Sequence, residues 1–123
     1  MNGAGDDDSQ RRLERALAHF VEAYRARPEL VEEQRGWNPV IGLSASDAPA
    51  RVMVAVDDGR IAPLWDETIE PTLEVRGGLE TLCDVLSLRK DPNEPYLFGE
   101  LTVAGAEADF VRLDYIASRL CPR

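Results

Sequence analysis

Apolar residues recur at helical spacing near the start of the chain and indicate an amphipathic helix from Gln10 to Arg27. We expect an N-cap at Asp8 or Ser9 to begin this helix, after a mobile leader formed by residues 1–9. Pro28 then ends the helix or begins a short second helical turn. The residues of the apolar stripe are Leu13, Leu17, Phe20, Val21 and Tyr24.

The middle of the chain predicts β-structure. Residues 37–46 carry few charges and two adjacent β-branched residues, which suits a short strand. Two further strand-like segments, Arg51 to Val56 and Arg60 to Trp65, flank the turn sequence Asp57-Asp58-Gly59. Because that composition favours positive φ, the pattern predicts a β-hairpin. Pro63 cannot donate a ladder hydrogen bond, so we expect the second arm to be an edge strand or to carry a bulge.

From about Leu73 to Leu120 the pattern predicts strand, helix, strand, helix around an apolar interior. The first strand alternates apolar with charged residues, and the following helix gathers its apolar residues on one face. Residues 92–98 form an irregular, apolar connection that we expect to lie over the core. The second strand, GELTVAG, is bounded by glycines. The apolar face of the first of these helices consists of Leu79, Leu82, Cys83 and Leu86.

The last helix has apolar residues on two sides. Val111 and Tyr115 form a small patch roughly opposite the main stripe, which a helix buried on one side does not need. The patch is either a pair of exposed surface residues or a contact for a ligand or a partner. The main stripe consists of Phe110, Leu113, Ile116, Ala117 and Leu120.

Charge and length narrow the classes of function. The chain has 123 residues, enough for one domain over residues 10–123. Its 23 acidic and 14 basic residues give a net charge of −9, which disfavours nucleic acid as a partner. No apolar run reaches the ~18 residues that a membrane span needs, and the start is acidic, so we expect a cytoplasmic protein. Arginine far outnumbers the single Lys90, which suggests a bacterial source.

The sequence shows no catalytic constellation, and we expect no enzyme activity, no cofactor and no metal. The only histidine, His19, lies on the polar side of its helix. Cys83 lies on an apolar stripe, where burial makes a thiol inert, and Cys121 is expected to be a second free thiol. Gly77-Gly78 before a helix lacks the surrounding residues of a phosphate-binding motif and indicates a tight turn.

Other polar and aromatic residues have structural explanations. Carboxylates at Asp57 and Asp58, and between Asp66 and Glu70, suit solvation and local hydrogen bonds in turns better than acid–base or metal chemistry. Trp37 and Trp65 either line a pocket or fill the core, and we expect them to fill the core.

From Arg51 onward the chain resembles the sterol carrier protein 2 (SCP-2 like) family of lipid-binding domains. The resemblance rests on the order of the hairpin with its DDG turn, strand LEVRG, helix LETLCDVLSL, a connector ending in Phe98-Gly99, strand ELTVAG and a final helix. It implies an α+β fold: a single layer of mainly antiparallel five-stranded sheet, covered by helices, with an apolar tunnel. The residues it implies as walls of that tunnel are Leu82, Leu86, Phe98, Leu101, Val103, Leu113 and Ile116.

Three functions are consistent with this sequence. The first is binding or carriage of a hydrophobic small molecule (fatty acyl, acyl-CoA, sterol or a similar lipid) without catalysis, because an excess of apolar helix faces on a small sheet can enclose a cavity. The second is a small isomerase or cyclase acting on a steroid- or polyketide-like substrate through a buried carboxylate. The third is a protein-interaction module that forms a homodimer or binds an enzyme through Val111 and Tyr115.

Overall fold

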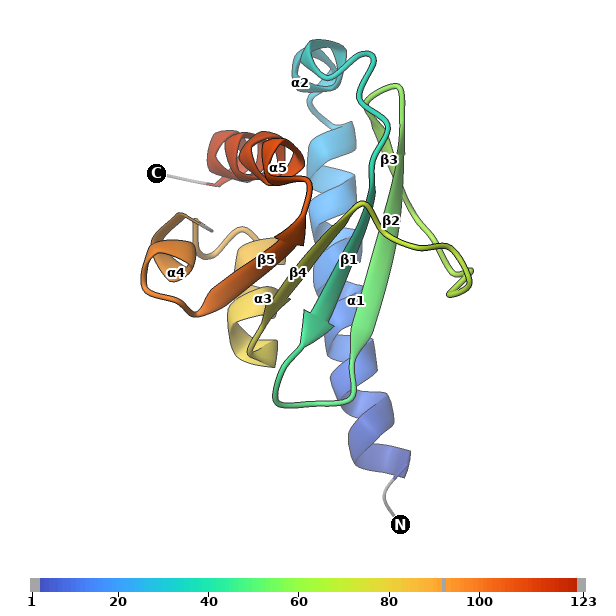
Figure 1. The fold of residues 1–123 in the computed structure, drawn as a ribbon, viewed down its shortest axis with the longest axis vertical. Helices are drawn as coiled ribbons and strands as arrows, with labels where there is room; N and C mark the ends of the chain where they lie inside the picture. Colours follow the sequence, from blue (N-terminus) through green and yellow to red (C-terminus); the bar gives the residue numbers. More distant parts are fainter. Residues whose placement is uncertain (1–2, 92, 122–123) are drawn as a thin grey trace.

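The computed structural model describes residues 3–91 and 93–121, and it consists of one five-stranded sheet with helices against one face (Figure 1). The strand order is β3-β2-β1-β4-β5, with β1 and β4 parallel and the other neighbours antiparallel. This is the α+β architecture with a mainly antiparallel five-stranded sheet that the family resemblance implies. The strands are β1 (Val40–Ala45), β2 (Arg51–Asp57), β3 (Arg60–Pro63), β4 (Leu73–Gly77) and β5 (Leu101–Gly105).

Three longer helices form the second layer of the molecule. In Figure 1 the first of them runs behind the sheet along β1 and β2, and it packs on β2 and β3, whereas the last packs on β4 and β5. The short second and fourth helices lie in connections. The helices are α1 (Gly3–Arg25), α2 (Pro28–Glu33), α3 (Leu79–Leu86), α4 (Asn93–Leu97) and α5 (Glu107–Leu120).

The predicted start of the first helix is wrong. The structure begins α1 at Gly3, several residues before the expected cap at Asp8 or Ser9. No proline occurs between Gly3 and Ser9, so no residue in this stretch prevents the helix from extending toward the N-terminus. Residues 1–2 of the predicted leader, and residues 122–123 at the end of the predicted domain, lie outside the described residues.

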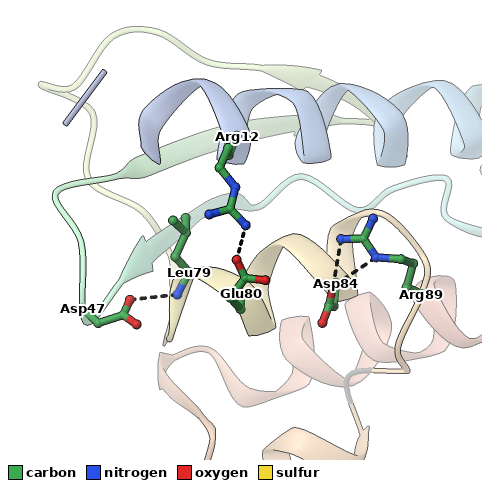
Figure 2. A network of polar contacts seen from close by, with 6 residues as sticks. All are labelled: Arg12, Asp47, Leu79, Glu80, Asp84 and Arg89. Carbon is green, nitrogen blue, oxygen red and sulfur yellow. Dashed lines mark hydrogen bonds and ion pairs between the residues drawn. The ribbon is translucent and has the colours of Figure 1, made fainter. Parts of the chain in front are cut away.

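The core lies between the sheet and α1, α3 and α5. Alternation along β4 buries Leu73 and Val75 and leaves Arg76 exposed, as the period of a half-buried strand requires. Helix α3 buries its predicted face completely, including Leu82 at 1% exposure. Its N-terminus is capped from another part of the chain, because Asp47 Oδ1 accepts a hydrogen bond of 2.9 Å from the Leu79 N–H (Figure 2).

The predicted hairpin is confirmed. Asp58 and Gly59 both have positive φ, 53° and 83°, as a tight turn between twisted strands requires. β3 is an edge strand, as Pro63 predicts. Its outer side is partly occupied, since Arg25 Nη2 donates to the Ile61 carbonyl at 3.1 Å.

The start of β2 extends beyond β3 and is covered by a side chain. The Gln10 amide donates to the Arg51 carbonyl at 2.8 Å and accepts from the Arg51 N–H at 2.9 Å. These two bonds reproduce the pair that a neighbouring strand would make.

The opposite face of the sheet carries a closed polar network. Arg51 Nη2 donates to Glu74 Oε1 at 2.7 Å, and Ser44 bonds to both partners from β1. The network lies directly over Gly42, where a Cβ atom would come within 2.5 Å of Glu74 Oε1. A Cβ atom at position 42 would therefore displace the ends of these two flexible side chains, and the backbone angles of Gly42 do not require glycine.

Two expectations about large side chains are corrected. Trp37 is buried as predicted, but Trp65 is 66% exposed in the loop after β3, so it does not fill the core. The connection over residues 93–98 folds as α4 and buries Pro95, but Leu97 and Phe98 point to solvent at 71% and 74% exposure. Trp65, Leu97 and Phe98 all lie in or next to turns outside the core. Their apolar character alone is therefore not enough to bury them.

Candidate functional site

A small apolar cavity lies where the sheet meets α1, α3 and α5. Ten side chains from these helices and from β1, β4 and β5 line it, and all ten are hydrocarbon. Alternation on the strands and the inward stripes of the helices bring them together. We call this space the inner cavity; its lining is Phe20, Leu43, Val75, Leu82, Val85, Leu86, Leu101, Phe110, Leu113 and Ala117.

The structure places the seven sequence-predicted wall residues in three ways. Four of them line the inner cavity directly: Leu82, Leu86, Leu101 and Leu113. Ile116 is fully buried and Val103 half-buried in the surrounding core. Phe98 is the exception, at 74% exposure.

The inner cavity is nearly filled by its own walls. Its free volume is about 20 Å³, roughly the space that one water molecule requires. Pockets that hold small-molecule ligands are typically on the order of 300–1,000 Å³. An apolar ligand can therefore enter only if a wall moves outward.

Helix α5, which forms one wall, is attached to the α2–β1 connection by polar contacts. The Trp37 indole N–H donates to Asp109 Oδ1 at 2.9 Å. Arg112 Nη1 donates to Gln34 Oε1 at 2.9 Å, and its guanidinium lies 5.9 Å from the Trp37 ring centre. Gln34 is buried at 3% exposure, so this bond satisfies a group that water cannot reach. Hydrophobic burial thus determines which face of α5 points inward. The contacts with Trp37 and Gln34 fix the position of α5 along the sheet.

The second apolar patch on α5 is exposed, as predicted. Val111 is 62% and Tyr115 42% exposed. The Tyr115 hydroxyl donates to Glu33 Oε1 at 2.9 Å, and Arg119 lies close to both groups. Tyr115 therefore has a role within the chain, as a further attachment of α5 to α2.

One carboxylate on α5, that of Asp114, lies in an environment that disfavours its charged form. Asp114 Oδ1 is buried without a hydrogen-bond partner. Burial raises the pKa of Asp114, and the nearby carboxylate of Asp91 raises it further. The sequence does not single out Asp114, because it lies between the two apolar sides of the helix and carries no motif.

A larger hollow opens at the other end of the molecule, between α1, α2 and β3. Its volume is about 670 Å³, and apolar surface from Val31 and Ile61 is mixed with the charged groups of Arg25 and Arg60. Tyr24 lies at its base, and its hydroxyl donates to the Gly59 carbonyl at 2.5 Å. Burial raises the pKa of Tyr24 to about 12, so this hydroxyl stays protonated. The hollow is open and charged at its rim, unlike the inner cavity.

The described residues offer little for catalysis. Burial raises the pKa of the Cys83 thiol, so it is protonated at neutral pH, as its place on the apolar stripe predicts. His19 is exposed on α1. Among residues 3–91 and 93–121, no group of three His, Cys, Asp or Glu side chains could hold a metal ion. In the same residues, no helix is both long and apolar enough to cross a membrane.

Comparison with solved structures identifies the fold. The chain resembles the sterol carrier protein domain 2 of Helicoverpa armigera with a TM-score of 0.69 and 16% identity, over 91% of this chain and 90% of that one. It resembles palmitated SCP2L2 from Aedes aegypti with a TM-score of 0.56 and 17% identity, over 80% and 91% of the two chains.

It also matches 14% of the sec-alkylsulfatase Pisa1 from Pseudomonas sp., over 76% of this chain, with a TM-score of 0.54 and 11% identity. No family model and no curated protein matches. The chain therefore has the fold of sterol carrier protein 2 domains, which confirms the resemblance drawn from its sequence.

Proposed function

We propose that this protein binds and carries a hydrophobic small molecule with an acyl-type or sterol-like apolar body, in the space between the sheet and α1, α3 and α5. The observation that carries the proposal is the lining of the inner cavity, in which all ten side chains are hydrocarbon. The Aedes aegypti neighbour with the same fold is described as palmitated. We assign Leu82, Leu86, Leu101 and Leu113 as contacts of the bound molecule.

The route of entry that the contacts favour lies between α4 and α5. The ring of Tyr96 on α4 packs against Phe110 on α5, with the ring centres 4.7 Å apart, and Phe110 lines the inner cavity. Just beyond Tyr96, Leu97 and Phe98 expose large apolar surfaces to solvent. These surfaces are suited to receive an apolar molecule before Phe110 moves aside. Phe98 then acts at the entrance, whereas Val103 and Ile116 support the wall from behind.

A ligand that opens the cavity must provide the energy for the opening. Moving Phe110 outward exposes apolar surface to water, which costs a free energy of about 25 cal/mol per Å². A ligand that buries its own apolar surface in the same place repays this cost. We therefore expect affinity to rise with the length of the apolar chain, until the enlarged cavity is full.

The decisive experiment measures saturable binding of a fluorescent acyl probe together with mass spectrometry of lipid extracted from gently purified protein. In the variant Ala117→Leu, three added carbons enter a cavity that has about 20 Å³ free, so probe binding should fall at least tenfold. Ala104→Leu, on the opposite face of the sheet, is the matched control and should bind normally. Absence of extractable lipid together with absence of saturable probe binding would remove the proposal.

The isomerase alternative requires a carboxylate with a raised pKa inside the apolar site. Asp114 is a carboxylate of that kind, but it is not among the ten residues that line the inner cavity. The carrier function is therefore the better supported one. We also propose that it is exercised in the cytoplasm, without a catalytic step.

A further inference from the structure

A basic hollow lies on the outer surface where α1 packs against α3. Its volume is about 340 Å³. Four of its seven lining residues are Arg12, Arg15, His19 and Arg89. The other three are Ala16, Cys83 and Ser87, so no carboxylate lines the hollow, although the chain has 23 acidic and 14 basic residues. We call this the α1–α3 hollow.

Two of its arginines are held in place by carboxylates on α3, as Figure 2 shows. Arg12 reaches across from α1 to form an ion pair with Glu80. Arg89 donates through both Nε and Nη2 to Asp84 Oδ1, at 3.0 and 2.8 Å. A guanidinium has five N–H donors, so each arginine keeps donors that these partners do not use.

Arg15 differs from those two. It is exposed, it lies one helical turn from both Arg12 and His19, and it forms no ion pair with any of the described residues. No carboxylate among the described residues is therefore paired with its charge. Ser87, at the C-terminal cap of α3, adds a hydroxyl that can donate a further hydrogen bond.

This combination matches the chemistry of a phosphate group. A phosphate has several acceptor oxygens and a charge near −2, and arginine forks are well suited to bind them. A single carboxylate would leave most of these donors unused. We propose that the α1–α3 hollow is a binding site for a phosphate group, contacted by Arg12, Arg15 and Arg89.

The phosphate group has two sources that the geometry allows. It is either a free small phosphate compound or the headgroup of an amphiphile whose apolar tail enters the inner cavity. The second source requires the tail to pass between α1 and α3, where Cys83 lines the hollow and its neighbour Leu82 lines the inner cavity, a path separate from the route between α4 and α5. The site itself does not depend on the proposed carrier function.

The test is a nuclear magnetic resonance titration of isotope-labelled protein with inorganic phosphate, at constant ionic strength set by chloride. Saturable shifts are expected at the backbone amides of Ala16 and Ser87. Arg15→Gln should weaken the binding about tenfold, since it removes charge-assisted hydrogen bonds. Arg11→Gln is the matched control: Arg11 is also exposed on α1 but does not line the hollow, so affinity should be unchanged.

Further titrations separate the two sources. Glycerol phosphate, decyl phosphate and decanol are compared in the same way. If decyl phosphate binds more tightly than glycerol phosphate, and Ala117→Leu removes only that advantage, the site holds a headgroup. Equal affinity for glycerol phosphate and decyl phosphate supports a site for free phosphate compounds.

Equal weakening by Arg15→Gln and Arg11→Gln, or shifts that do not saturate, would overturn the phosphate site. If decanol and acyl probes fail to bind while inorganic phosphate still does, the carrier function fails and the phosphate site stands.

Discussion

Replacing Leu82 by alanine should convert the nearly filled inner cavity into a binding site for small apolar molecules. Leu82 is 1% exposed and lines the cavity, so the change removes buried hydrocarbon from its wall. Leu13→Ala is the matched control, because Leu13 is fully buried on α1 but does not line the cavity. Both variants lose the same side-chain atoms, but only one of them enlarges the inner cavity.

The expected loss of stability follows from the size of the deletion. Leucine-to-alanine changes in a core cost about 3–5 kcal/mol, because transfer energy is lost and a void remains. Unfolding entropy of about 2.1 cal/mol/K per residue gives about 0.26 kcal/mol/K for 123 residues, so each kcal/mol lowers Tm by about 4 °C. Leu82→Ala should therefore melt about 12–20 °C below the parent chain, and Leu13→Ala by a similar amount.

The assay is thermal unfolding followed by circular dichroism, with and without a small apolar probe such as benzene. A probe present at one hundred times its dissociation constant restores about 2.7 kcal/mol, or about 10 °C. We expect this recovery in Leu82→Ala and little recovery in Leu13→Ala. Equal recovery in the two variants, or none in either, would refute the location of the inner cavity.

Three further predictions concern other parts of the molecule. Gly59→Ala should cost about 1–2 kcal/mol in urea unfolding, because its φ of 83° strains any residue with a Cβ atom and that atom would meet the Gln34 carbonyl oxygen at 2.8 Å, whereas Gly78→Ala, with no atom nearer than 3.5 Å, should cost nothing. Burial and a neighbouring carboxylate raise the pKa of Asp114, so its charged form destabilises the fold above that raised pKa and the penalty disappears below the ordinary value of about 4. Asp114→Asn should then stabilise the protein at neutral pH, on the order of 1 kcal/mol at most, with no gain in acid; a gain independent of pH would contradict this. Cys83 should react with a thiol reagent far more slowly in the folded protein than after unfolding, and equal rates would show that it is not buried.

Local signals predicted the arrangement of the elements well. The Asp57-Asp58-Gly59 turn, the alternation around Leu73 and the apolar stripe of α3 each depend on residues close in sequence. The parallel pairing of β1 with β4 was not predicted, because it joins segments about thirty residues apart and leaves no periodic signal in either. The start of α1 at Gly3 was missed for a different reason: a good capping residue at Ser9 does not prevent the helix from beginning earlier.

The candidate site was predictable only in part. Stripes on α3 and α5 identify inward-facing residues, and four of the seven predicted wall residues line the inner cavity. Phe98 was named because the family resemblance implied it as a wall residue, but its exposure depends on how α4 ends, which a short irregular segment does not reveal. Whether a core is solid or hollow depends on packing at the scale of single methyl groups, and residue type does not encode that.

Coverage of the sheet edge by Gln10 and Arg25 has a consequence for the protein at high concentration. Unpaired backbone groups on an edge strand attract the strands of other molecules and start aggregation. Here the Gln10 side-chain amide forms hydrogen bonds with the backbone N–H and carbonyl of Arg51, and Arg25 donates to the Ile61 carbonyl. Pro63 has no backbone N–H that could bond to another strand. Few positions on this side remain open to an incoming strand. This edge of the sheet therefore resists the strand-to-strand assembly that leads to fibrils, while the apolar surfaces of Leu97 and Phe98 stay exposed elsewhere on the molecule.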